Sequence, residues 1–344
     1  MGGMPSIVLK SHIFTAVCNL FLSAAHKADV RGGRRHCFFI VNTPTKGNID
    51  ICMRNLFYVI ALFFVSISLQ AAQLNVASFN IWMSPDGIKN GWQDRKESVA
   101  KLVRYHDFDI FGTQEGFFHQ LDDIKLGDGI YDYVARGREN GEREGETSAI
   151  FYKKDKFELL DSGHFWFSET PEKSSLGWDA MCKRICTWGK FKVKSDGKVF
   201  YFFCCHFDHK GDKARNNSAA LYVGMIKKIA NGATFIGVGD FNLTPDKDPI
   251  KLILKDGSIL DARKVSETPP YGPRFTWHGN ALKPKMSERI GYIFVSPDIK
   301  VSSFGVLTDL LSESPEDFSE NKHPKNPEIR HPSDHYPVEA KIRF

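Results

Sequence analysis

Short apolar runs, bounded by Gly, Pro, Asn and Asp, recur along the chain from residue 74 onwards. This pattern is typical of β-strands separated by turns. The predicted strands are Leu74–Trp82, Asp109–Thr113, Tyr131–Ala135, Ser148–Tyr152, Arg184–Val193, Val199–Phe207, Thr234–Asp240, Arg274–Trp277, Arg289–Val295 and Pro337–Ile342.

Two longer segments between these strands have helical spacing instead. In Lys213–Ala230, the residues Leu221, Met225 and Ile229 recur every fourth position, and Gln93–Tyr105 carries a similar apolar side. Several strands are apolar almost throughout, which predicts burial on both faces. The pattern therefore predicts an α/β fold in which mixed sheets form a sandwich covered by helices.

The segment 53–72 has the features of a secretory signal peptide. A basic start precedes an apolar stretch of about 14 residues, shorter than the ~20 needed to span a membrane, and Ala71-Ala72 offers a cleavage site. The alternative is a buried core helix. Export to a periplasm or the outside is the better interpretation, with no membrane span after processing.

Residues 1–52 show neither helical nor strand periodicity and precede a second possible start at Met53. Our hypothesis is that they are a non-native or unstructured extension. Detection of these residues in the natural precursor by mass spectrometry would contradict it.

Removal of residues 1–72 changes the charge of the chain. They hold seven Lys and Arg and two Asp and Glu, out of 46 and 41, so residues 73–344 carry 39 of each. A neutral mature chain gives no support for a surface that binds long duplex DNA.

Residues 73–344 contain no linker, repeat or low-complexity run, so we expect one domain and a monomer. Four cysteines remain, Cys182, Cys186, Cys204 and Cys205, without the paired spacing of a structural zinc site. Their disulfide state stays open. Cys204 and Cys205 are neighbours on a strand and point to opposite faces, so they should not pair with each other.

Four polar clusters each close a predicted strand: Phe79-Asn80, Gln114-Glu115, Gly239-Asp240-Phe241-Asn242 and Ser333-Asp334-His335. Strand ends can hold short polar side chains rigidly at the rim of a sheet. Oxygen ligands drawn from distant segments suit Mg²⁺, or Mn²⁺ in its place, rather than zinc. The clusters together predict a metal-assisted site for phosphate-ester cleavage.

The mature chain resembles the endonuclease/exonuclease/phosphatase superfamily from residue 74 to residue 344. The segments that carry the resemblance are 78–81, 112–115, 205–209, 239–242, 289–293 and 333–337. The resemblance implies a four-layer sandwich with the active site between the two sheets.

The resemblance also implies roles for single residues. Glu115 matches the principal metal ligand, with Asn80 beside it and Asp334 as a further carboxylate. Asp240 and Asn242 match the pair that orients the attacking water and the phosphate. His206 and His335 match two histidines that flank the scissile phosphate. Without the other clusters, an Asn or Asp at a strand end is more often a turn residue, and a lone histidine is usually structural.

Two further positions concern the residues that orient the two histidines. Glu146 resembles the acid that orients His206 in the deoxyribonuclease branch, although it could be a solvated loop charge. Where the family has Arg-x-Asp-Tyr, this chain has Arg289-Ile290-Gly291-Tyr292, and the missing aspartate is the one that holds the equivalent of His335. Gly291 cannot replace it, which predicts a weakened site.

The segment His164–Lys190 is rich in aromatic residues and resembles a secreted bacterial subgroup of the superfamily. Its rings and Arg184 could stack a base or sugar, or the rings could pack in the core under a long loop.

The sequence therefore predicts an exported Mg²⁺-dependent hydrolase of phosphodiester bonds, most simply a nuclease. A phosphatase or phosphodiesterase acting on phosphorylated small molecules, lipids or inositol phosphates is the first alternative. A weakened module that only binds phosphate or sugar is the second.

Overall fold

The computed structural model describes residues 73–344, apart from 84–86, 88–89, 127–128, 285–287 and 314–327. The predicted extension 1–52 and signal peptide 53–72 lie outside the described residues. The described residues belong to one compact unit. In the described part of the chain, no helix combines the length and apolar character that a membrane span requires.

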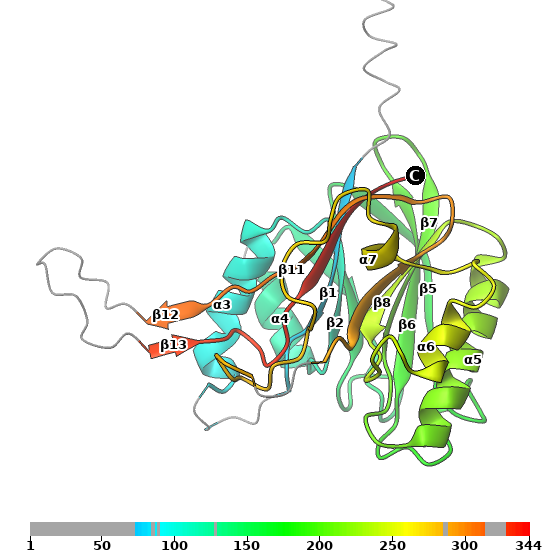
Figure 1. Ribbon diagram of the computed structural model, residues 1–344, viewed down its shortest axis with the longest axis horizontal. Coiled ribbons are helices and arrows are strands. Elements are labelled where there is room, and N and C mark those ends of the chain that lie inside the picture. The colour runs from blue at the N-terminus through cyan, green and yellow to red at the C-terminus, as the bar shows by residue number, and fades with distance from the viewer. Residues whose placement is uncertain (1–72, 84–86, 88–89, 127–128, 285–287, 314–327) are drawn as a thin grey trace, which may run out of the picture. The chain divides into compact units, whose positions relative to one another are not determined.

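Two six-stranded mixed sheets form the centre of the unit (Figure 1). The first sheet has the order β11-β14-β1-β2-β4-β3, with bounds Lys300–Val306, Val338–Arg343, Leu74–Asn80, Ile110–Gln114, Ser148–Lys153 and Tyr131–Val134. The second has the order β5-β6-β7-β8-β10-β9, with bounds Phe157–Trp166, Ile185–Val193, Val199–His206, Phe235–Asp240, Gly291–Val295 and Leu260–Asp261. A separate ribbon pairs β12 (Leu311–Glu313) with β13 (Glu328–Arg330).

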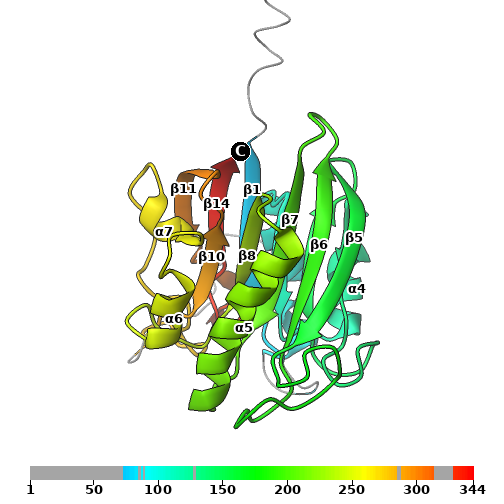
Figure 2. The same cartoon turned by 90° about the vertical axis from the view of Figure 1, so that its right-hand side faces the viewer.

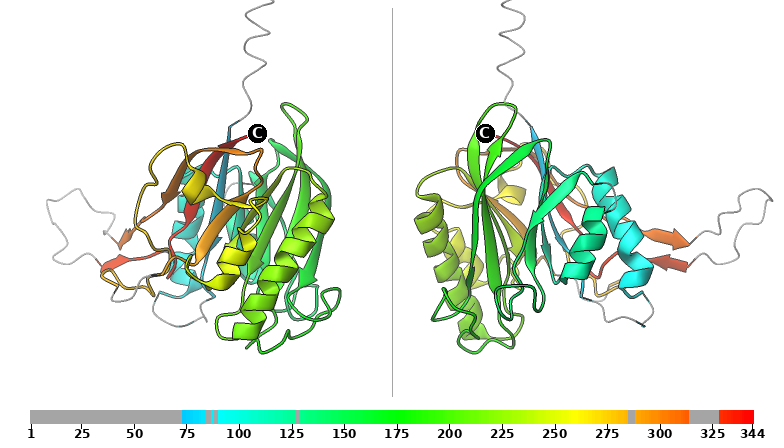
Figure 3. Two further views of the ribbon diagram at one scale, coloured as in Figure 1. Left: turned by 45° about the vertical axis from the view of Figure 1, so that its right-hand side comes forward. Right: turned by 180° about the vertical axis from the view of Figure 1, so that it is seen from behind.

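Helices cover the outer faces of both sheets (Figures 1 and 2). Those on the first sheet are α3 (Trp92–Tyr105) and α4 (Phe118–Leu126). Those on the second are α5 (Asp212–Ala230) and α6 (Asp248–Ile253), and the short α7 (Ala262–Val265) lies beside the β9–β10 edge. Figure 3 shows the same order of layers from two further sides. The predicted α/β sandwich of two mixed sheets flanked by helices is confirmed.

The alternation of side chains along the strands produces three apolar layers. Val76, Ile110 and Cys204 point into the core between the sheets. Phe79 packs outward under α3, while Cys205 packs outward under α5. Cys204 and Cys205 thus lie in different layers, and all four described cysteines are free thiols.

The predicted strand Arg274–Trp277 is wrong. This segment is a loop whose bridges are isolated ones, from Trp277 to Glu288 and His335. The N–H groups of Thr276 and Trp277 both donate to the carbonyl of Glu288, so the segment pairs with a loop and not with the ladder of a strand. The sequence analysis also missed the edge strands β5 and β11, where bulges at Leu159/Asp161 and Val301/Ser303 break the alternation.

Candidate active site

The strand register brings the predicted residues to one end of the sandwich. Parallel strands β1 and β2 place Asn80 opposite Gln114, so Glu115 follows at the same rim. In the other sheet, parallel strands β7 and β8 place His206 opposite Asp240. Half of the site therefore comes from each sheet.

The amide of Asn80 joins the two halves. Its Nδ2 donates to Oε1 of Glu115 at 2.8 Å and to Oδ2 of Asp240 at 3.0 Å. Its Oδ1 accepts from the backbone N–H of Trp82 at 3.0 Å. Asn80 thus holds the two carboxylates in place, and a metal bound directly to Asn80 would have to share Oδ1 with Trp82.

Glu115 occupies a backbone conformation that non-glycine residues seldom adopt, with φ at 66°. This turn ends β2 abruptly and aims the side chain at the rim, where Oε2 accepts from the N–H of Met83 at 3.0 Å. Strain of this kind is found where a side chain must be aimed for function.

Asp240 is buried between the two histidines. Its Oδ2 lies 3.8 Å from Nε2 of His206 and 3.6 Å from Nδ1 of His335. Burial raises the pKa of Asp240, against the opposing effects of His335 and of the hydrogen bond from Asn80. A raised pKa makes the carboxylate a better proton acceptor.

The loop 333–335 completes the rim. The hydroxyl of Ser333 donates to the carbonyl of Asn80 at 2.6 Å, which ties this loop to the end of β1. Burial raises the pKa of Asp334, and the nearby carboxylates of Glu115 and Asp240 raise it further. Oδ1 of Asp334 lies 3.7 Å from Nε2 of His335.

Asn242 positions the first histidine. Its Nδ2 donates to Nε2 of His206 at 3.0 Å and to the carbonyl of Phe207 at 3.0 Å. Burial, reinforced by Arg184 and Arg138, lowers the pKa of His206 well below its usual range. Both observations indicate a neutral imidazole in this state, and an anionic phosphate beside it would favour the proton.

Glu146 contacts an arginine and not the histidine that we expected it to orient. Its carboxylate accepts from Nη1 of Arg138 at 2.6 Å, and no described hydrogen bond joins it to His206. Burial raises the pKa of Glu146 to about 7 although Arg138 opposes the shift. Glu146 stays a candidate site residue, and its contact is with Arg138.

Gly291 lies opposite Asp240 across β10 and β8. A Cβ at this position would come 3.3 Å from Oγ1 of Thr276, a tight but not prohibitive approach. Arg289 of the same motif is engaged elsewhere, in a two-point ion pair with Asp261 at 2.9 and 2.6 Å. His335 still has two carboxylates near it, Asp240 and Asp334, on opposite sides of the ring.

Arg95 is a functional-site residue that the sequence analysis missed. It lies on α3, is fully buried, and donates to the carbonyls of Ile81, Trp82, Asn90 and Pro332 at 2.7 to 3.0 Å. It thereby ties the loop after Asn80 to the loop before Asp334. The sequence does carry a sign that Arg95 is buried. It lies three residues after Trp92 and four before Val99, on the apolar side of the helix.

The aromatic segment is partly core. Trp166 is buried, and its Nε1 donates to the carbonyl of Arg138 at 2.7 Å, so it supports the loop that carries Arg138. Leu176 and Met181 in the same segment are exposed. The packing alternative therefore holds for Trp166.

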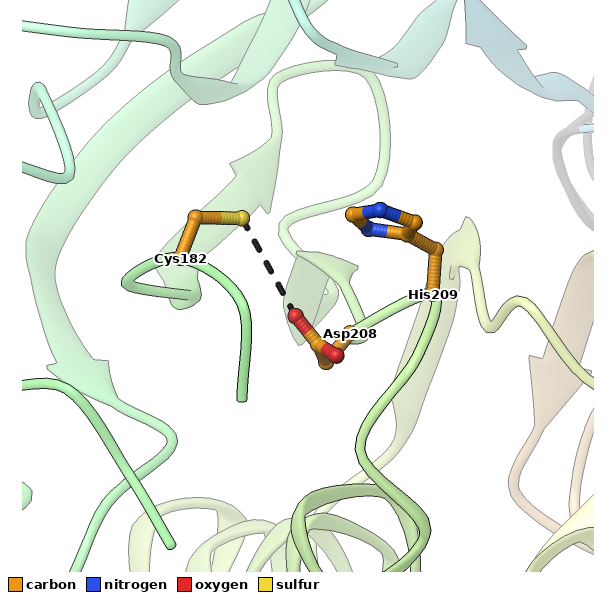
Figure 4. A group of neighbouring side chains, drawn as sticks. All are labelled: Cys182, Asp208 and His209. Carbon is orange, nitrogen blue, oxygen red and sulfur yellow. Dashed lines mark hydrogen bonds between the residues drawn. The ribbon is translucent and has the colours of Figure 1, made fainter. Parts of the chain in front are cut away.

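Cys182, Asp208 and His209 form a separate cluster, which Figure 4 shows. Their ligand-type atoms lie within 4.8 Å of one another, a spacing compatible with a metal ion. However, the guanidinium of Arg184 bonds Nδ1 of His209 at 2.9 Å and lies 3.6 Å from Asp208. Arg184 already supplies the positive charge at this cluster.

The main rim suits a hydrated, hard cation. Glu115, Asp240 and Asp334 are all oxygen donors, and their mutual repulsion contributes to the raised pKa values of Asp240 and Asp334. Mg²⁺ is usually bound through one or two carboxylates and keeps several waters. Glu115 and Asp334 are the residues that would hold it.

Comparisons with known proteins identify the family of this chain. The endonuclease/exonuclease/phosphatase family pattern matches residues 77–335. A solved member of that family from Bacteroides thetaiotaomicron is 40% identical, with a TM-score of 0.74, and the match covers 80% of this chain and 99% of that one. A mannosyl-6-phosphatase of Bacteroides thetaiotaomicron VPI-5482 is also 40% identical, with a TM-score of 0.73, covering 79% and 100%.

A viral sequence is similar as well. The uncharacterized protein L388 of Acanthamoeba polyphaga mimivirus is 29% identical over 163 residues, or 45% of this chain. The match spans 60% of the length of that curated relative.

Proposed function

The chain belongs to the endonuclease/exonuclease/phosphatase family, and from that premise we propose that it is an exported, divalent-metal-dependent phosphoester hydrolase whose substrate is a sugar phosphate. The observation that carries the hydrolase part is the Asn80 amide, which joins Glu115 from one sheet to Asp240 from the other. The sugar phosphate is favoured by the 40% identity to a mannosyl-6-phosphatase, a match that spans all of that chain.

The residues divide the reaction between them. Asp240, buried and with a raised pKa, accepts the proton of the attacking water. His206 and His335 flank Asp240 at 3.8 and 3.6 Å. They can donate to the phosphate oxygens, His206 once the anionic phosphate favours its protonated form. Asn242 keeps His206 in place. A divalent ion held by Glu115 and Asp334 would neutralise negative charge on the phosphate.

A sugar phosphate also agrees with the charge of the mature chain. Binders of long nucleic acid usually present many Lys and Arg contacts, whereas residues 73–344 are formally neutral. This shifts the preference from the nuclease that the motifs suggested to the phosphatase alternative.

The test is hydrolysis of mannose 6-phosphate, p-nitrophenyl phosphate and bis(p-nitrophenyl) phosphate, with Mg²⁺ or Mn²⁺ against EDTA. We expect metal-dependent release from the two monoesters that disappears in Glu115→Ala. Glu97→Ala is the matched control, because Glu97 is an exposed carboxylate on α3 whose side chain is 80% exposed.

Each other outcome has a definite meaning. Faster release from the diester would restore the phosphodiesterase interpretation. Binding of mannose 6-phosphate without turnover on any substrate would favour the weakened binding module. Cell fractionation followed by N-terminal sequencing tests export, for which we expect a mature chain that begins at Gln73.

A further inference from the structure

An open pocket of about 540 Å³ lies at the β9–β10 edge of the second sheet. It is lined by Pro245, Arg263, Lys264, Pro270, Arg274 and Arg289. Pro245 follows Asn242 by three residues, so the pocket begins at the loop that leaves the active site. Arg263 and Lys264 belong to α7, which lies on the same side of the sheet as α6 (Figure 2).

Positive charge in this pocket exceeds the negative charge available to balance it. Four of the six lining residues are cationic, and none of the six is acidic. The buried acid next to them, Asp261, already binds Arg289 at two points, with both oxygens engaged.

The cationic side chains lie near enough to repel one another. Burial lowers the pKa of Arg263, and the charges of Arg289 and Arg274 lower it further, against the attraction of Asp261. An anion in the pocket would relieve this repulsion.

Two guanidinium groups also have N–H donors without an acceptor. Nε of Arg289 and Nη1 of Arg263 are buried and have no hydrogen-bond partner among the described residues. Arg289 itself is only 7% exposed. Buried donors are nearly always satisfied in folded proteins, and an anion in the pocket would satisfy these two if the guanidinium groups turned toward it.

We propose that this pocket is an oxyanion subsite that binds a second phosphate or sulfate group of an extended, phosphorylated glycan whose scissile phosphate lies at Asp240. Guanidinium groups suit this role because their N–H donors match the oxygens of phosphate. An effect of the pocket on KM rests on the proposed function, whereas anion binding by the pocket does not.

The first experiment measures binding directly. Calorimetry with inorganic pyrophosphate is performed in EDTA on the full chain carrying Glu115→Ala, so that the metal-dependent site does not contribute. Arg263→Gln/Arg274→Gln should weaken binding at least about tenfold, because one charge-assisted contact is worth roughly that factor. Arg289 is left unchanged because of its pairing with Asp261.

The control is Lys96→Gln/Lys101→Gln, which removes the same charge from α3 on the first sheet. It should leave the affinity for pyrophosphate within about twofold of the parent protein. Equal weakening by both double variants would show a general charge effect and would overturn the subsite.

The second experiment uses turnover. On a mannose oligosaccharide with several phosphates, Arg263→Gln/Arg274→Gln should raise KM at least about tenfold and leave kcat unchanged. Its KM for p-nitrophenyl phosphate, which has a single phosphate, should stay the same.

The remaining outcomes separate the two proposals. Intact pyrophosphate binding with no turnover on any substrate would refute the proposed function and leave the subsite standing. An unchanged KM for the oligosaccharide would show that the pocket holds a free anion and would overturn its role in substrate binding. A KM effect seen with a DNA oligonucleotide and not with the glycan would assign the pocket to a nucleic acid, which also contradicts the proposal.

Discussion

Arg95 allows the sharpest test of how the site is held together. Its guanidinium donates to four carbonyls: Nε to Asn90 at 2.9 Å, Nη1 to Ile81 at 2.8 Å and Pro332 at 2.7 Å, and Nη2 to Trp82 at 3.0 Å. Arg95→Met keeps much of the apolar stem and removes all four donors. Arg95→Lys keeps the charge and loses the planar fork.

The size of the effect follows from two opposing quantities. A hydrogen bond from a charged donor contributes roughly 2 kcal/mol, so four contribute about 8 kcal/mol. Burial lowers the pKa of Arg95 from 12.5 to about 10, against the charges of Asp334, Glu115 and Asp94, and a net shift of that size corresponds to about 3 kcal/mol against the charged form. We therefore expect Arg95→Met to lower the free energy of unfolding by about 4–5 kcal/mol and Arg95→Lys by about half as much.

Urea unfolding without added metal measures both variants. Lys101→Met is the control, because it lies on the same helix with its side chain 73% exposed, and it should change the unfolding free energy by less than about 0.5 kcal/mol. Arg95→Lys, which stays folded, should also need about tenfold more Mg²⁺ for half-maximal turnover, since groups that support metal ligands have effects of that order. A loss below about 1 kcal/mol for Arg95→Met would refute this account of Arg95.

Three further predictions concern the rim. Glu115→Gln should lower metal-dependent turnover at least about 100-fold with unchanged thermal stability, since it removes one carboxylate charge from the cluster; a loss of less than tenfold in steady-state assays would contradict its role as a ligand. Gly291→Asp should raise turnover of bis(p-nitrophenyl) phosphate by restoring a carboxylate partner for His335, with Gly291→Asn as the uncharged control; an unchanged or lower rate would count against the missing-partner explanation. Burial raises the pKa of Glu146 from 4.5 to about 7, so between these pH values the folded state holds a proton that the unfolded state has lost. The unfolding free energy of the parent protein should therefore fall by about 3 kcal/mol, relative to that of Glu146→Gln, as the pH rises from 4.5 to 7. Urea titrations across this range test the last prediction, and a constant difference between the two proteins would refute it.

The central strands could be predicted because they are buried on both faces and therefore apolar throughout, as in β7 and β8. The edge strands β5 and β11 could not, since a bulge shifts the register of each and β5 has an exposed middle. The segment Arg274–Trp277 was predicted as a strand from its local pattern. In the fold it meets other loops at isolated bridges and has no neighbouring strand.

The candidate site was predictable in its members and not in their contacts. Asn80 and Asp240 end β1 and β8, and Glu115 follows β2 directly, a local signal that the sequence carries, whereas Asp334 lies in the loop before β14. The link from Asn80 to Asp240 joins residues 160 positions apart and depends on how the two sheets face each other. Arg95 and the pocket cations were missed for the same reason, because their roles depend on loops that come together only in the fold.

The division of the rim between two sheets has a consequence for how this protein would lose activity. The 3.0 Å hydrogen bond from Asn80 to Asp240 joins the two sheets, and the apolar core fills the space between them. The length of this hydrogen bond therefore depends on the distance between the sheets. A substitution that shifts the sheets by a few tenths of an ångström would disturb this bond while leaving each sheet intact. On gentle heating, activity should therefore be lost at a lower temperature than secondary structure. A ligand that contacts both sheets at the rim should reduce the difference between these two temperatures.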